Sequence, residues 1–253
     1  MREFFHYFFG AGDEIEFKYF SLAHILPILI AVIIIYLIYR YRDFLRESKW
    51  DEKLRLIMSF TLIITEMSYF WRLVGVPDLK PDPTDHLPIT VCGWGVIFSA
   101  YFVITKNQTL FDITYFWLFS GTLFALATPT VISYCGPTRF RYYQFWCEHL
   151  LGYIALFYMI FVHGMKIKFK AIFKSVACLA VLAVIAYIAN ITLGDDANYL
   201  FMAMPEDTTS VLDFLPKNFA LRVVIMGLVI VALFFVAYLP WYFIEKKNRK
   251  KEA

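Results

Sequence analysis

The chain has 253 residues, of which 60% are hydrophobic and 20% aromatic, and its mean hydropathy is +0.60. Soluble globular domains are nearer ~45–50% apolar, so this composition excludes an ordinary soluble fold and indicates an integral membrane protein. The net charge of +3 comes from basic residues that flank the apolar segments, which favours contact with anionic lipid headgroups and argues against a nucleic-acid partner.

Seven apolar runs are long enough to cross a bilayer, which takes roughly 20 residues at a rise of 1.5 Å each. In chain order they are residues 20–41, 54–74, 88–105, 111–132, 140–163, 170–190 and 219–244. No internal repeat or low-complexity linker divides them. We therefore expect an all-α membrane protein in which residues 1–253 form a single seven-helix transmembrane domain.

Basic residues are concentrated on one set of alternate loops. The segments at 40–55, 106–110, 164–174 and after 244 hold 16 of the 24 Lys and Arg residues, so the positive-inside rule places them in the cytoplasm. The N-terminus is then expected outside and the C-terminus in the cytoplasm. The first apolar run follows acidic residues and is long for a signal peptide, so we expect it to remain as an uncleaved insertion signal.

The first two spans carry ionisable side chains at unequal depths. His24 lies near the outer end of the first span, whereas Glu66 lies near the middle of the second and Arg72 further out. A charge at mid-depth costs ~2.5–3.5 kcal/mol, so it needs a partner or a water-filled cavity. Glu66, Tyr69 and Arg72 fall on one helical stripe, which allows a Glu66–Arg72 pair, directly or through Tyr69. Such a pair is either a structural contact or the source of a catalytic carboxylate.

The third span begins after His86, with Pro88 suited to the first helical position and Cys92 in the second turn. A buried cysteine becomes a nucleophile only if a base takes its proton. The alternative is a packing role, because Cys92, Gly95 and Ser99 form a stripe of small residues that lets another helix approach.

The fifth span supplies the base that such a nucleophile needs. His149, with Glu148 beside it, lies about two and a half turns from the outer end of this span, at a depth similar to that of Cys92. Taken alone, His149 fits an interhelical hydrogen-bonding residue better than a catalytic base. Together with His24, Glu66, Arg72 and Cys92, the two residues predict a polar pocket that opens outward or toward the outer leaflet.

No cofactor or metal is expected. The cysteines at 92, 135, 147 and 178 show no CxxC or zinc spacing, and a disulfide between Cys135 and another outer-side cysteine stays open. The last span has no lysine for a retinal Schiff base. A metal-dependent lipid hydrolase is a further alternative, although its four possible ligands have no recognisable spacing; these are His24, Glu66, His86 and His149.

Three elements carry a resemblance to a known family. The run 86–92 (His-Leu-Pro-Ile-Thr-Val-Cys), the Gly121…Thr128-Pro129 face of the fourth span and His149 resemble the YwaF-type bacterial integral membrane proteins. These in turn resemble a vertebrate multi-pass acyltransferase that remodels ether phospholipids. They are more remotely similar to the androgen-induced hydrolases of fatty-acid esters of hydroxy fatty acids. The resemblance covers nearly the whole chain and implies a bacterial cytoplasmic membrane.

The resemblance implies a lipid acyltransferase or transacylase in which Cys92 is the nucleophile and His149 the base, with a thioester intermediate. His24, Glu66, Tyr69, Arg72, His86 and Glu148 would support the site or bind substrate. The remoter hydrolases use a threonine nucleophile, so hydrolysis is also open. One residue departs from the pattern: Thr130 stands where an acidic residue is expected after the proline of the fourth span.

Membrane phospholipids or lysophospholipids are the expected partners, and the sequence leaves the oligomeric state open. A second hypothesis comes from another class of protein: a transport or small-ligand-binding component that uses the same pocket without catalysis. Dependence on the thiol separates the two, because a binding pocket tolerates Cys92→Ala far better than a covalent enzyme does.

Overall fold

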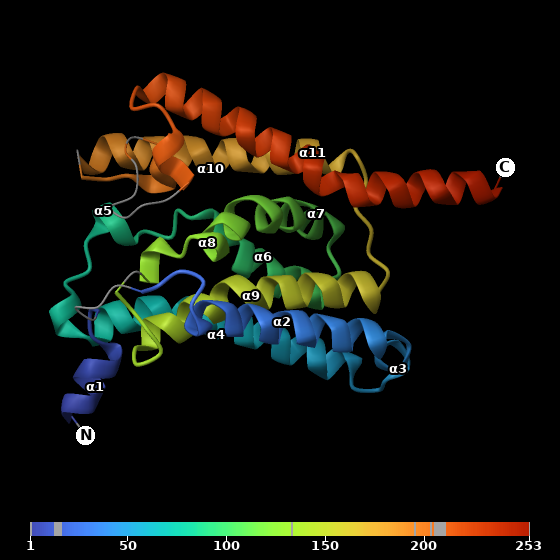
Figure 1. Cartoon of the computed structure of the whole chain (residues 1–253), viewed down its shortest axis with the longest axis horizontal. Coiled ribbons are helices and arrows are strands. Elements are labelled where there is room, and N and C mark those ends of the chain that lie inside the picture. The colour runs from blue at the N-terminus through green and yellow to red at the C-terminus, as the bar shows by residue number, and fades with distance from the viewer. Residues whose placement is uncertain are drawn as a thin grey trace.

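The computed structural model describes residues 2–12, 17–132, 134–194, 196–202, 204 and 211–252, and all regular elements within these ranges are helical (Figure 1). Each of the seven expected runs forms a helix. They are α2 (Leu22–Arg40), α4 (Asp51–Gly75), α6 (Val91–Thr105), α7 (Gln108–Trp117) continuing through a π-turn (η2, Leu118–Thr122) into α8 (Leu123–Ala127), α9 (Phe140–Phe161), α10 (Ala171–Leu193) and α11 (Phe219–Glu252).

Short elements connect or precede these helices. The α-helical ones are α1 (Arg2–Phe9), α3 (Arg42–Glu47) and α5 (Pro83–His86). The 3₁₀ turns are η1 (Pro77–Leu79), η3 (Thr130–Ile132), η4 (Tyr199–Phe201) and η5 (Val211–Phe214).

Four helices are long and apolar enough to cross a membrane: Leu22–Arg40, Gln108–Ala127, Ala171–Leu193 and Phe219–Lys250. The chain is therefore an all-helical integral membrane protein. The apolar helix α6 has only 15 residues, and α4 and α9 carry many of the buried polar side chains. Seven helices match the seven expected spans, and four of them meet the length and hydropathy that crossing requires.

The long helices lie side by side with roughly parallel axes (Figure 1). In this view α2, α4 and α9 form one side, α6 and α7 lie in the middle, and α10 and α11 form the other side. The short helix α3 and the C-terminus lie at one end of the bundle, here called the α3 end. The helices α1 and α5 lie at the opposite end, here called the α5 end.

The tightest packing lies among α4, α6, α7 and α9. Phe102, Phe111, Phe145 and Leu156 are fully buried there. In α2, α10 and α11, by contrast, only 11% of the apolar span is buried within the protein. Apolar side chains left on the surface of a bundle favour contact with lipid tails, so these three helices present the lipid-facing surface.

Two helix boundaries differ from the expected ones. Thr90 is the N-cap of α6 and its Oγ1 accepts a hydrogen bond from the Gly93 N–H (3.0 Å), so Cys92 lies in the first turn and Pro88 precedes the helix. The fourth span ends at Ala127 instead of residue 132. Pro129 disfavours the helical conformation in the residue before it, so the helix stops there.

Candidate functional site

Cys92 lies where three helices meet at the α5 end. Its partly buried thiol accepts a hydrogen bond from the Thr122 hydroxyl, with 3.6 Å between Oγ1 and Sγ. Thr122 is the last residue of the π-turn η2, and Gly121 beside it packs against Val91. A π-turn widens a helix locally and often marks a functional site. Here it brings a hydroxyl group to the sulfur.

The π-turn is also held from α9. The Tyr153 hydroxyl donates to the backbone carbonyl of Leu118 at 2.5 Å, and Tyr153 interacts electrostatically with the Cys92 thiol. The i→i+5 pattern of η2 leaves no trace in the sequence, so Thr122 and Tyr153 were not among the expected site residues. The structure adds both to the surroundings of Cys92.

His149 is buried on α9, where its Nδ1 lies 2.9 Å from the carbonyl oxygen of Phe145. A carbonyl oxygen can only accept, so Nδ1 carries the proton and Nε2 of the neutral ring carries the lone pair. The ring also stacks on Phe145, with 4.2 Å between centroids. The hydrogen bond fixes the tautomer and the stacking restrains the ring plane, so Nε2 is the nitrogen that can act as a general base.

The depths of Cys92 and His149 follow from the packing of α6 on α9. Ser99 Oγ lies 3.6 Å from the position that a Cβ on Gly152 would take, so these two residues are level. Both helices run from the α5 end toward the α3 end (Figure 1). Cys92 lies seven residues before Ser99, and His149 lies three before Gly152. Cys92 therefore lies about 6 Å nearer the α5 end than His149 along the helix axes. Side chains on both helices lean toward the N-terminus, and the longer histidine side chain leans further than the cysteine, which reduces this difference in level.

The carboxyl group of Glu66 lies against the first turn of α6. Glu66 is buried, with 5% of its surface exposed, and its Oε1 is 2.6 Å from the position that a Cβ on Gly93 would take. The other oxygen, Oε2, has no hydrogen-bond partner. Glu66 and Glu148 both interact electrostatically with the Cys92 thiol. Only a glycine at position 93 leaves room for a carboxyl group so close to the backbone.

Glu148 differs from Glu66 in having partners. Its Oε2 accepts a hydrogen bond from Gln144 Nε2 at 2.8 Å and lies 3.6 Å from Arg141 Nη1. The guanidinium of Arg141 also lies over the ring of Tyr69, 4.5 Å from its centroid. Arg141 is therefore the cation of this cluster, a role for which the sequence suggested Arg72.

Arg72 forms hydrogen bonds with the N-terminal segment. Its Nε and Nη2 donate to the backbone carbonyls of Phe9 (2.8 Å) and Gly10 (2.5 Å), and no ion pair joins it to Glu66 among the described residues. The expected Glu66–Arg72 pair is therefore not formed, because Arg72 is used to hold the N-terminal segment against α4.

The two other histidines expected to support the site, His24 and His86, make separate contacts. His24 accepts a hydrogen bond from the Phe20 N–H at Nδ1 (3.0 Å), so its Nε2–H donates to the carbonyl of Leu126 at 2.8 Å. His86 Nδ1 lies 2.9 Å from the Tyr69 hydroxyl, and burial lowers the pKa of His86 below its usual value. His24 therefore joins α2 to the end of α8, whereas His86 borders the cluster around Tyr69.

Among the described residues, no three His, Cys, Asp or Glu side chains gather closely enough to hold an ion. No disulfide joins any two of the four cysteines, so the disulfide left open for Cys135 is not formed.

The model of one protein family matches residues 19–239, which is most of the chain. This chain belongs to the TMEM164 family. No curated protein and no solved structure matches it. The matched range of this TMEM164 family member includes the whole cluster around Cys92 and His149, together with all of α2 to α10.

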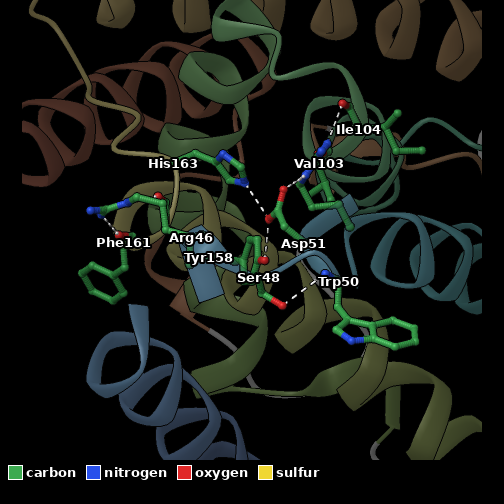
Figure 2. Close-up of polar contacts among 11 residues, drawn as sticks. Arg46, Ser48, Trp50, Asp51, Val103, Ile104, Tyr158, Phe161 and His163 are labelled. Carbon is green, nitrogen blue, oxygen red and sulfur yellow. Dashed lines mark hydrogen bonds and ion pairs between the residues drawn. The ribbon is translucent and has the colours of Figure 1, made fainter. Parts of the chain in front are cut away.

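This member of the TMEM164 family also has a polar cluster at the α3 end (Figure 2). Asp51 Oδ1 accepts hydrogen bonds from the Tyr158 hydroxyl (2.7 Å) and from His163 Nε2 (2.9 Å), and its Oδ2 accepts one from Arg55 Nε (3.0 Å). Burial alone would raise the pKa of Asp51, but these contacts outweigh it and hold the pKa below its ordinary value of 3.8. Sequence reasoning missed this cluster, because its members are far apart in the chain.

Two arginines at the α3 end, Arg55 of this cluster and Arg46 of α3, close two helix ends. Arg55 Nη1 donates to the carbonyls of Val103 (3.1 Å) and Ile104 (2.9 Å) in the last turn of α6. At the end of α9, the guanidinium of Arg46 donates to the carbonyls of Phe161 (3.0 Å) and Val162 (2.8 Å). Cationic side chains on the free carbonyls of a helix C-terminus stabilise it. Arg55 and Arg46 therefore stabilise the C-terminal ends of α6 and α9, at the end of the bundle remote from Cys92.

Proposed function

We propose that this protein is a membrane-embedded lipid acyltransferase or transacylase in which Cys92 is the nucleophile and His149 the general base. The observation that carries the proposal is the tautomer of His149. Its Nδ1–H is held by the Phe145 carbonyl, which leaves Nε2 as the basic nitrogen of a side chain on α9, the helix that packs against α6 and its Cys92.

The acylation step follows from these roles. His149 Nε2 takes the proton of the Cys92 thiol as the sulfur attacks the carbonyl carbon of a phospholipid ester. The tetrahedral intermediate collapses when the bond from carbon to the glycerol oxygen breaks. His149 returns its proton to that oxygen, so a lysophospholipid leaves and a thioester remains on Cys92.

Deacylation reverses the proton transfers. The hydroxyl of an acceptor lysophospholipid gives its proton to His149 Nε2 and attacks the thioester carbon. The bond from carbon to sulfur breaks, and the sulfur recovers its proton from His149. Water in place of the acceptor would give hydrolysis.

The start of α6 supplies donors for the oxyanion that forms in both steps. The backbone N–H groups of Val91 and Cys92 belong to the first turn, where no carbonyl of the same helix can accept from them. Donors at a helix N-terminus stabilise a developing negative charge. Arg72 is not available for this role, because its guanidinium is bonded to the carbonyls of Phe9 and Gly10.

Access to the site is proposed from the membrane. The proposed topology has seven spans, with the N-terminus outside and the C-terminus in the cytoplasm. The α5 end with Cys92 then lies toward the outer leaflet. The apolar surfaces of α2, α10 and α11 face lipid, and an acyl chain can enter sideways between helices. A bacterial cytoplasmic membrane is the proposed location.

A lipid-turnover assay tests the proposal. The protein in nanodiscs is supplied with a phospholipid that carries a labelled acyl chain and with a lysophospholipid acceptor. Transfer of label should be lost in Cys92→Ala and retained in Cys147→Ala, because Cys147 is exposed on α9 and takes no part in the site. If wild type and both variants transfer label equally, or if none of the three transfers it, the transport or ligand-binding role is favoured instead.

A further inference from the structure

Glu66 and Glu148 form an unequal pair of carboxyl groups beside the proposed nucleophile. They interact electrostatically with each other, and Arg141 is the cation that acts on both. Glu148 holds Arg141 and the Gln144 amide, whereas Oε2 of Glu66 is buried without any partner. Two like charges so close together are unfavourable, and one cation neutralises one of them. The ionised member is the one with the cation, so the proton resides on Glu66.

A protonated carboxyl group is a hydrogen-bond donor, and Glu66 is placed where a donor is useful. Its Oε1 lies against Gly93, one residue beyond Cys92, and its buried Oε2 has no hydrogen-bond partner. The first-turn N–H groups of Val91 and Cys92 begin the same helix. A buried carboxylic acid kept neutral can donate to an oxyanion as effectively as a backbone amide.

We propose that Glu66 is a catalytic residue that is held as a neutral carboxylic acid and donates Oε2–H to the oxyanion formed when Cys92 attacks an ester. No proton is transferred in this role: the O–H hydrogen bond stabilises the negative oxygen and is released when the carbonyl re-forms. The inference rests on the proposed acyl transfer for its substrate, but the protonation of Glu66 is a separate claim about the resting protein.

Infrared spectroscopy of the full chain in nanodiscs tests the protonation without turnover. At neutral pH the wild type should show the carbonyl stretch of a buried carboxylic acid. The band should vanish in Glu66→Gln and persist in Cys147→Ala, which leaves both carboxyl groups and Arg141 in place. A wild type without a band that depends on Glu66 overturns the inference, whatever the activity.

Acylation rates of the same proteins test the role of the donor. Glu66→Gln keeps an N–H donor at this position and should retain most of the rate, whereas Glu66→Met should lose roughly 10²–10³-fold, the usual effect of removing one oxyanion donor. A glutamine variant as slow as the methionine variant would mean that the carboxylate form is needed, and it would overturn the inference. The thermal unfolding of both variants identifies a folding defect, and the isosteric glutamine keeps the comparison valid if the methionine variant fails to fold. If wild type forms no thioester at all, the proposed function and the oxyanion role fall together while the infrared result stands by itself.

Discussion

His149 donates its Nδ1–H to the carbonyl oxygen of Phe145, one helical turn earlier on α9, at 2.9 Å. The contact decides which nitrogen of the ring is basic, since a carbonyl cannot donate in return. It also uses a backbone acceptor that every substitution at position 145 retains. The tautomer of His149 therefore depends on the helix backbone, whereas the Phe145 ring restrains only the ring plane.

Replacement of His149 by alanine should slow the acylation of Cys92 by roughly 10²–10⁴-fold, the usual contribution of a positioned general base. The thiol remains, so a slow reaction at high pH should survive, because hydroxide can then remove the proton. Single-turnover acylation over a range of pH measures both effects. His6→Ala, on the exposed N-terminal helix, is the matched control and should react at the wild-type rate. An unchanged rate in His149→Ala would remove its role as the base.

Gly93→Ala should displace the carboxyl group of Glu66, because the new methyl group would lie 2.6 Å from Oε1 and 2.9 Å from Thr90 Oγ1. We expect a loss of acylation similar to that of Glu66→Met and a loss of stability of about 1–3 kcal/mol, which is typical of overpacking. Gly95→Ala on the same helix has open space around its Cβ and should be neutral or slightly stabilising. Denaturation and acylation assays of the two variants check the difference, and equal behaviour of both would contradict the close approach of Glu66.

The helices were predictable from the sequence, but several of their ends were not. Each of the seven apolar runs corresponds to a helix, and four of these helices are long and apolar enough to cross a membrane. The start of α6 was predicted at Pro88, yet Thr90 is the residue whose side chain caps the helix. Both residues suit a helix start, and the choice depends on how the preceding loop packs, which one sequence does not reveal.

The partners of buried charges were the least predictable part of the site. Arg72 bonds to carbonyls more than 60 residues away in the chain, and Glu148 bonds to Arg141, a residue that the sequence placed at the edge of its span. Helical spacing identifies which residues share a face, but it does not identify which face of which helix lies opposite. The π-turn that carries Thr122 was invisible for the same reason, since it depends on packing against Tyr153.

Asp51→Asn should destabilise the protein at neutral pH by about 1–3 kcal/mol, because Tyr158, His163 and Arg55 lose a charged acceptor. The folded-state pKa of Asp51 lies below its ordinary value, so its contribution is complete above about pH 4 and is lost as the pH falls through the folded-state pKa. The difference in stability between wild type and variant should therefore shrink in acid.

Asp43→Asn is the control for that measurement. The side chain of Asp43 is 69% exposed and contacts only Arg42 and Arg46 at the surface, so its replacement should change stability by no more than about 0.5 kcal/mol. Thermal unfolding in nanodiscs from neutral to acidic pH measures all three proteins. A constant difference between wild type and Asp51→Asn across that range would show that the carboxylate of Asp51 does not support the α3 end.

The proposed orientation predicts the behaviour of reporter fusions. A fluorescent protein that matures only in the cytoplasm should be bright when fused to the C-terminus. It should be dark when fused after residue 82, which lies in the connection between α4 and α6. The reverse pattern, or brightness at both sites, would contradict seven spans with the N-terminus outside.

The mass of the intact protein tests the central claim most directly. Wild type and Cys92→Ala are incubated with a phospholipid acyl donor, and their masses are measured before and after treatment with hydroxylamine, which cleaves thioesters. The account predicts an acyl-sized gain that occurs in wild type, disappears with hydroxylamine and is absent from Cys92→Ala. A wild type that turns over lipid without this gain, or a gain that persists in Cys92→Ala, would contradict catalysis by the Cys92 thiol.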